Sequence, residues 1–183
     1  MSPRLRTTLL LLERHFEEAI ASFCLSVIAV CVFLQVVLRY GFGTALTWTE
    51  ELAGFAMAWA VYMGAALGVR ERFHIRILVG VFALPRLLQL PVVLTADLLW
   101  LLFNLIMIWF GLEYVELLWT RTAIAPALGI DQVWPQSIIV IGYLLITARL
   151  LQIYWLWWAG GRQDIPGKPP EFQEEKLEGL ELP

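Results

Sequence analysis

Four long apolar stretches, separated by shorter polar connections, dominate the pattern of hydrophobic and polar positions along this chain. They cover about residues 19–38, 52–69, 90–112 and 133–158. Each has close to the roughly 20 residues that an α-helix needs to cross a bilayer core of about 30 Å. The pattern therefore predicts an all-α integral membrane unit over residues 19–158, with four membrane-spanning helices.

The segments around these four spans are more polar and contain most of the charged residues. Residues 1–18 are expected to form a cytoplasmic or interfacial segment, in which apolar residues at helical spacing predict a short helix. In the second connection, residues 70–89, apolar positions alternate with arginines, which predicts an amphipathic helix lying in the membrane interface. Pro85 and Pro91 are expected to end that helix and to start the third span. The polar residues 159–183 are expected to be disordered.

The distribution of charge gives the expected orientation of these helices. The chain is 60% hydrophobic and only 16% charged, whereas a soluble domain has about 25% charged residues. Ten of its 13 Lys and Arg residues lie in the N-terminal segment, the second connection and the C-terminal tail. Because basic residues accumulate on the cytoplasmic side of membrane proteins, both termini and the second connection are predicted to be cytoplasmic.

Two ionisable residues, Asp97 and Arg149, fall inside predicted spans, where charged groups are costly and are therefore candidates for function. Both are expected about 8–9 Å from the cytoplasmic edge of the membrane, given a helical rise of about 1.5 Å per residue. We predict that they pair or share a small polar network. Such a pair would hold two helices in register; an ion or proton path and snorkelling of both side chains are the alternatives.

Small and polar residues inside the spans point to helix packing. Asn104 lies seven residues after Asp97 and faces the same way, which suits an interhelical hydrogen bond. Gly64 and Gly68, with two alanines between them, form a small-residue patch in the second span. Such a patch would let another helix approach closely.

The sequence contains few candidate residues for catalytic or redox chemistry. The two histidines, His15 and His74, lie outside the spans, whereas a haem in a helical bundle needs histidine ligands within them. Cys24 and Cys31 lie inside the first span, where a free cysteine behaves as a small apolar residue. We therefore expect no enzyme, no metal site and no cofactor on this chain. An autonomous four-helix transporter or channel is the alternative function, with Asp97 as its only candidate coupling carboxylate.

Residues 30–80 carry an ordered series of short motifs across the first two spans. The series runs through Arg39-Tyr40-Gly41-Phe42, Trp48-Thr49-Glu50-Glu51, Phe55, Trp59, Gly64-Ala65-Ala66, Arg70-Glu71-Arg72 and His74-Ile75-Arg76-Ile77. With these motifs in this order, and with a four-span layout over about residues 15–160, the chain resembles the small membrane subunit of tripartite ATP-independent periplasmic (TRAP) transporters, the DctQ-like family.

The resemblance implies a role in the uptake of an organic acid across the bacterial inner membrane, driven by an ion gradient, usually of sodium. A soluble periplasmic protein would capture the substrate, and a large DctM-like membrane subunit would carry the substrate and sodium sites. This chain would brace the large subunit and hold no substrate, metal or catalytic site of its own. Its expected partners are the large subunit, the periplasmic binding protein and membrane lipids, with no nucleic acid.

The resemblance also suggests roles for the residues that match its motifs. At the external end, Arg39 is expected to pair with Glu50 or Glu51, the alternative being a headgroup-facing arginine beside two glutamates at a helix start. Arg121 and Asp131 are candidate contacts for the periplasmic binding protein. The residues expected at structural or subunit interfaces are Arg39, Tyr40, Trp48, Glu50, Glu51, Trp59, Arg70, Arg72, His74 and Arg76. The last four of that set would anchor the cytoplasmic turn after the second span.

Overall fold

The computed structural model describes residues 3–44, 46–70 and 85–159, and this part of the chain is almost entirely helical. The helices are α1 (Pro3–Gly41), α2 (Thr47–Arg70), α4 (Arg86–Thr120), α5 (Val133–Gln136) and α6 (Ile138–Ala159). Helix α5 is a single turn that leads directly into α6. Four segments are long and apolar enough to cross a bilayer, one of them running from α5 into α6. The predicted all-α unit with four potential spans is confirmed.

Helices α1 and α4 extend far beyond the spans predicted from hydropathy. Helix α1 has 39 residues and joins the short helix expected near the N-terminus to the first span. Helix α4 has 35 residues, begins directly after Pro85 and continues through Pro91. At about 1.5 Å per residue, α4 is roughly 50 Å long and exceeds a bilayer core of about 30 Å. The amphipathic helix predicted in the second connection and the polar tail fall largely on residues 71–84 and 160–183, outside the described residues.

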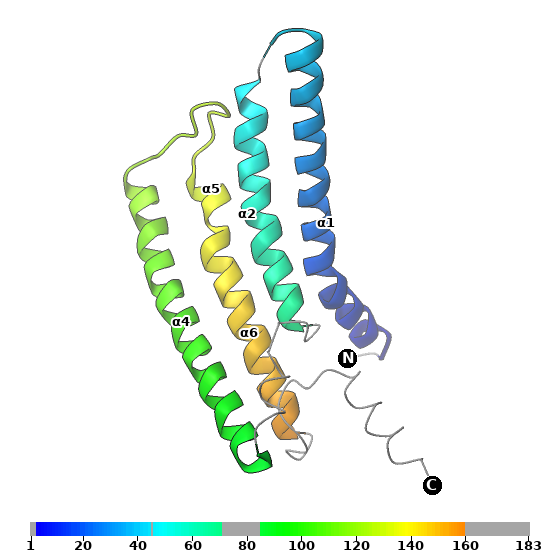
Figure 1. Ribbon diagram of the computed structural model, residues 1–183, viewed down its shortest axis with the longest axis vertical. Helices are drawn as coiled ribbons and strands as arrows, with labels where there is room; N and C mark the ends of the chain where they lie inside the picture. The colour runs from blue at the N-terminus through cyan, green and yellow to red at the C-terminus, as the bar shows by residue number, and fades with distance from the viewer. Residues whose placement is uncertain (1–2, 45, 71–84, 160–183) are drawn as a thin grey trace.

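The four long helices lie side by side in a single layer, in the order α1, α2, α6, α4 (Figure 1). Helix α1 packs on α2, α2 on α6, and α6 on α4, while the short α5 touches α2, α4 and α6. Within the described residues the backbone of α4 does not come close to α1 or α2, although Trp100 of α4 packs against the cluster that Ala66 and Val69 form with Ile146. The chain therefore forms an open row of helices, in contrast to a closed four-helix bundle with a central core.

The buried apolar residues line the seams of this row and form no single core. One cluster joins Ala21 of α1, Met63 of α2 and Ile138 of α6. A second cluster joins Ala66 and Val69 of α2 to Ile146 of α6. Both clusters centre on the contact between α2 and α6, the two inner helices of the row. The backbone of each outer helix lies close to only one long neighbour, although α1 also reaches α6 through side chains such as Glu17 and Ala21.

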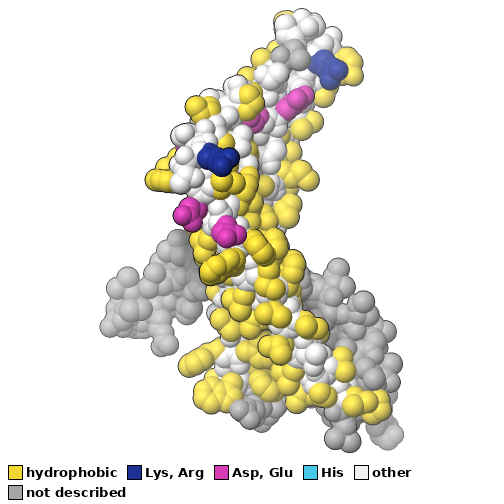
Figure 2. All heavy atoms as spheres, turned by 90° about the vertical axis from the view of Figure 1, so that its left-hand side faces the viewer, with side chains coloured by type: hydrophobic (Ala, Val, Ile, Leu, Met, Phe, Trp, Pro, Cys, Tyr) yellow, Lys and Arg dark blue, Asp and Glu magenta, His cyan; other side chains and the backbone are white. Residues whose placement is uncertain are grey.

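Large apolar side chains remain exposed along the helices. They include Phe33 on α1, Leu98 and Trp109 on α4, and Trp155 on α6. Viewed from the α4 edge of the row, hydrophobic side chains cover the lower part of the molecule and charged ones lie in the upper part (Figure 2). An apolar surface of this extent needs lipid or protein to cover it.

The described connections lie at one end of the row. Residues 42–46 join α1 to α2, and residues 121–132 join α4 to α5 (Figure 1). We call this the connection end. The first of these connections leaves α1 through Gly43, whose φ of +68° is the left-handed conformation that commonly ends a helix. At the opposite end of the row lie Glu17 of α1 and the last residue of α2, Arg70. We call this the Glu17 end.

Candidate functional site

A buried carboxylate between two arginines ties three helices together at the Glu17 end. Only 1% of the Glu17 side chain is exposed. The Arg149 Nε of α6 donates to Glu17 Oε1 at 2.8 Å, and Arg70 Nη1 of α2 lies 3.4 Å from Glu17 Oε2. Arg149 Nη1 also donates to Gln152 Oε1 at 2.7 Å. A buried charge is tolerated when opposite charges and hydrogen bonds surround it, and Glu17 has both.

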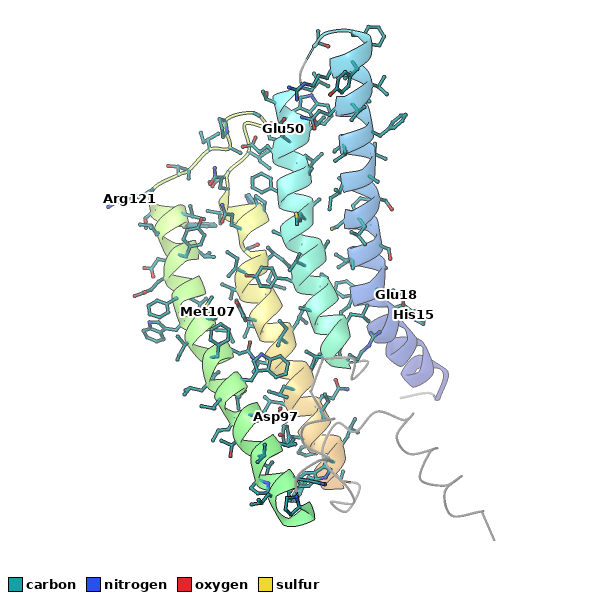
Figure 3. The ribbon with its side chains drawn as sticks, viewed as in Figure 1. His15, Glu18, Glu50, Asp97, Met107 and Arg121 are labelled. Atoms are coloured by element: carbon teal, nitrogen blue, oxygen red, sulfur yellow. The ribbon has the colours of Figure 1, made fainter. Side chains whose placement is uncertain are left out.

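The position of Glu17 follows from the face that α1 turns toward its neighbours. Glu17, Ala21, Cys24 and Cys31 are all buried, at spacings of four, three and seven residues. Residues at these spacings share one side of a helix. Glu17 is therefore the first residue of a buried stripe that continues with small side chains. Its neighbour Glu18 is exposed and, like His15, lies low on α1 in Figure 3.

Asp97 and Arg149, expected to pair, have other described partners. Asp97 is buried on α4 and accepts a short hydrogen bond from the Tyr154 hydroxyl of α6. Arg149 bonds to Glu17 of α1, and the predicted pair or shared network of Asp97 and Arg149 stays a prediction. The predicted use of both residues to link helices agrees with these contacts, but each makes its own described link. Figure 3 places Asp97 in the lower half of α4, on the side of the Glu17 end.

A regular pairing of residues runs along the seam between α4 and α6. Asp97 bonds to Tyr154 at one point, and a Cβ atom on Gly111 would lie 3.1 Å from Val140 at another. Midway between them, seven residues from each, the antiparallel register brings buried Asn104 to the level of buried Thr147. A seven-residue spacing is typical of helices that pack at a small crossing angle. Asn104 is buried, but among the described residues its Nδ2 atom has no hydrogen-bond partner, so the predicted interhelical hydrogen bond is not found there.

Glu50 and Glu51 have separate roles at the connection end. Glu50 accepts a short hydrogen bond from Gln35 Nε2 of α1. The Glu51 Oε2 atom accepts two backbone N–H groups, from Ala127 at 3.0 Å and Leu128 at 2.8 Å. Glu50 thus joins α2 to α1, while Glu51 joins α2 to the connection between α4 and α5.

Arg39 does not make the ion pair expected of it. Its side chain is exposed at the end of α1, and no ion pair of Arg39 is found among the described residues. Both glutamates at the start of α2 have other partners. The physical reason is geometric: Gln35 lies one turn earlier on α1 than Arg39, and its side-chain amide already bonds to Glu50. The alternative, an arginine that faces the headgroups, agrees with this exposure.

Other predicted interface residues contribute contacts within the chain or lie on its surface. Trp59 Nε1 donates to the Pro135 carbonyl oxygen at 3.0 Å, which links α2 to α5. Tyr40 and Trp48 are exposed at the connection end. Arg72, His74 and Arg76 lie outside the residues that the structure describes.

The two residues proposed as binding-protein contacts differ in their surroundings. Arg121 is exposed where α4 ends, and Figure 3 shows it at the outer edge of the connection end, pointing away from the row. The Asp131 Oδ1 atom accepts the backbone N–H of Val133 at 3.1 Å. Asp131 therefore helps to start α5, which is a local role within the fold.

The middle of the row carries aromatic and aliphatic contacts. Tyr62 of α2 meets the edge of Tyr143 of α6 with ring centroids 5.5 Å apart, and Phe103 of α4 meets Tyr143 at 6.3 Å. In the part of the chain that the structure describes, no group of three or more His, Cys, Asp or Glu residues could hold a metal ion. Charged contacts at the two ends and apolar contacts between them are suited to holding helices in fixed positions.

Comparison with known proteins identifies the family of this chain. The family model described as "Tripartite ATP-independent periplasmic transporters, DctQ component" matches residues 28–160, well over half of the chain. The chain belongs to the DctQ family. The match begins within α1, includes α2, α4, α5 and α6, and confirms the resemblance drawn from the motifs.

Relatives in three bacteria carry names from the same family of transporters. A TRAP transporter small permease protein of Haemophilus influenzae is 30% identical over 141 residues, covering 75% of this chain and 86% of the relative. The C4-dicarboxylate TRAP transporter small permease protein DctQ of Vibrio cholerae is 28% identical over 191 residues, covering 90% and 79%. The isethionate TRAP transporter permease protein DctMQ of Oleidesulfovibrio alaskensis is 24% identical over 147 residues, covering 77% of this chain and 23% of that protein.

Several residues that join the helices of this DctQ-family chain escaped the sequence analysis. Glu17, Gln35 and Tyr154 all make bonds between helices. A usable signal existed for Glu17, because it lies seven residues before Cys24 and 14 before Cys31, on the face that α1 buries. Hydropathy alone places the residue in the polar segment in front of the first span. Gln35 and Tyr154 carry no comparable signal, since their roles depend on which helices become neighbours.

Proposed function

We propose that this chain is the small accessory subunit of a TRAP transporter that takes up an organic acid. In this proposal a large DctM-like subunit carries the substrate, an ion gradient of sodium drives uptake, and a soluble periplasmic protein delivers the acid. The substrate and sodium sites lie on the large subunit, and this chain braces it. Support for the large partner comes from the isethionate relative, whose name combines DctM with DctQ and of which this chain spans 23%.

The observation that carries the bracing role is the open row of helices with its polar contacts at the two ends. Glu17, Arg70 and Arg149 fix three helices at one end, and Glu51 fixes a connection at the other. Between them the described side chains are mainly apolar, whereas a translocation site needs polar groups that converge near the midplane, often at broken helices. The exposed apolar surface of a single helix layer supplies area for a membrane partner and for lipid.

We further propose that the protein lies in the bacterial inner membrane with both termini in the cytoplasm. Ten of 13 basic residues belong to segments that adjoin the Glu17 end or extend from it in sequence. Cytoplasmic connections of membrane proteins are enriched in such residues. The Glu17 end then faces the cytoplasm and the connection end faces the periplasm.

The experiment that tests the function is reconstitution with and without a partner. The tagged chain is purified from detergent extract, and the protein that comes with it is identified. Proteoliposomes are then made with this chain alone, the large partner alone, and both together, in each case with the soluble binding protein and an imposed sodium gradient. Uptake of a labelled organic acid is expected only when both membrane proteins are present.

The same experiment addresses the alternative, an autonomous four-helix transporter or channel. The feature in its favour is Asp97, a buried carboxylate within a span. Gradient-driven flux through liposomes that contain this chain alone would support the alternative and contradict the accessory role. Absence of a large membrane partner from the purified material would contradict the accessory role as well.

A further inference from the structure

The connection between α4 and α5 is built as a fixed loop, although it contains no long helix or strand. The Ala125 N–H donates to the Ile130 carbonyl oxygen at 2.8 Å, and the Gln132 N–H donates to that of Ala123 at 2.8 Å. Gly129, with a φ of +68°, makes the turn between them. Ala125 is completely buried. We call residues 121–132 the outer loop.

Helix α2 holds the outer loop from outside through one carboxylate. Glu51 Oε2 accepts the N–H groups of Ala127 and Leu128, which are consecutive residues at the turn of the loop. Hydrogen bonds to an ionised acceptor are stronger than those between neutral groups. Because the two donors are backbone groups, Glu51 fixes the path of the loop itself. The Trp59 bond to the Pro135 carbonyl oxygen adds a second link from α2 just beyond the loop.

The loop held in this way exposes apolar side chains. Ile124 is 63% exposed and Ile130 is 43% exposed, and the two lie on opposite sides of the turn, where Ile124 and Asp131 form an isolated antiparallel bridge. These residues belong to neither α4 nor α6 but to the segment that connects them at the end of the row. Isoleucines on a rigid loop lose little conformational freedom when a partner covers them, which favours binding.

We propose that Glu51 is a positioning residue for transport: it fixes the outer loop so that Ile124 and Ile130 meet the soluble substrate-binding protein. This inference rests on the proposed function, which supplies a soluble partner at the connection end. A water-soluble protein is a better partner for this loop than lipid tails are. The loop lies beyond the last turn of α4, and its first residue, Arg121, is an exposed charged residue that lipid tails would not accommodate. Glu51 acts only through the two amides and does not itself touch the partner.

The test measures how uptake depends on the concentration of binding protein. Proteoliposomes contain the large subunit and either the wild-type chain or a variant. Glu51→Ala removes the acceptor, and we expect about a fivefold rise in the binding-protein concentration for half-maximal uptake, as for loss of one anchor in an interface. The maximal rate should stay within about twofold of wild type. Glu51→Gln keeps an acceptor oxygen and should shift the half-maximal concentration less than Glu51→Ala does.

Two further sets of variants separate the loop from the rest of the molecule. Glu116→Ala removes an exposed glutamate of α4 and should leave the half-maximal concentration unchanged. Ile124→Ser and Ile130→Ser leave Glu51 in place and should reproduce the rise that Glu51→Ala causes. Amide hydrogen exchange at Ala127 and Leu128 should become faster in Glu51→Ala but not in the isoleucine variants, because only the former frees these N–H groups.

Each contrary outcome has a separate meaning. An unchanged half-maximal concentration in Glu51→Ala, together with faster exchange at the two amides, would overturn the inference. A loss of maximal rate alone would also overturn it and would assign the loop to the large subunit or to lipid. If Glu51→Ala does not fold, the isoleucine variants decide by the same measurement. Failure of the wild-type complex to take up any acid would instead count against the proposed function.

Discussion

At the scale of single residues, Glu17 is the least exposed charged side chain in the described part of the chain. Its carboxylate is almost fully removed from solvent, and two arginines from other helices surround it. Such a cluster adds modest net stability as a whole, because desolvation offsets much of the attraction. Removing one partner is different, since it leaves the remaining charges buried without compensation.

Glu17→Ala should therefore destabilise the protein markedly. We expect a loss of about 3 kcal/mol, the lower end of the range for breaking a buried ion pair, because Arg70 and Arg149 retain some exposure to solvent. The loss should appear as a lower melting temperature in detergent, followed by tryptophan fluorescence. Glu18→Ala is the matched control, because this neighbouring glutamate is exposed. Equal melting temperatures for the two variants would show that the cluster does not hold the helices.

The same residues show what the sequence could predict at this scale. Hydropathy marks Asp97 and Arg149 as candidates for function, because charged groups inside spans are rare. The choice of partner could not be predicted, since it depends on α1 lying close enough to α6 for Glu17 to reach Arg149. A charged residue just outside an apolar stretch looks solvated in sequence. Only the order of helices in the row shows that Glu17 is buried.

At the scale of helices, close packing depends on different glycines from those expected. Cβ atoms on Gly64 and Gly68 of the predicted small-residue patch would meet nothing within 4 Å in the described part of the chain. A Cβ atom on Gly142 of α6 would lie 2.5–2.7 Å from Tyr62 of α2. The contact that brings the two inner helices together is therefore a glycine against a tyrosine. Within the patch, Ala66 is fully buried against α6, whereas Gly64 and Gly68 leave room for an added methyl group.

Gly142→Ala should force α2 and α6 apart. The added methyl would overlap the Cβ and Cγ atoms of Tyr62, which cannot move without their helix. We expect destabilisation of about 2 kcal/mol, as for other overpacked interiors. Gly54→Ala serves as the control, because its methyl would meet nothing within 4 Å and alanine favours helices more than glycine does. Thermal unfolding of both variants in the same detergent tests this; a Gly142→Ala variant as stable as wild type would contradict the packing described here.

The helices themselves were predictable, whereas their ends and order were not. Four apolar stretches of span length fix the number of long helices, because a bilayer core requires about 20 apolar residues for each. Helix α4 nevertheless begins before Pro91 and continues through it, although a proline at the sixth helical position cannot donate to the Leu87 carbonyl oxygen. The open order of the row depends on seams such as Gly111 against Val140, which have no signature in hydropathy.

At the scale of the whole molecule, the open row of helices suits the proposed roles, in which this chain braces a large subunit and that subunit carries the acid. Its seams are filled, its inner helices carry apolar clusters, and its polar contacts lie toward the two ends. Such a layer has surface for another membrane protein, and its described middle carries apolar and aromatic contacts. Substrate preference should then belong to the partners.

Exchanging the small subunit between transporters tests this division. A large subunit and binding protein of known substrate are combined either with their own small subunit or with a DctQ-family chain from a transporter of a different acid. Since the proposed role of the small subunit is only to brace the complex, its replacement should lower the uptake rates of all acids by a common factor, through weaker assembly, and leave their ratios unchanged. Competition between two labelled acids measures the ratios, and co-purification confirms that the exchanged chain has assembled. A preference that follows the small subunit would show that this layer contacts the substrate after all.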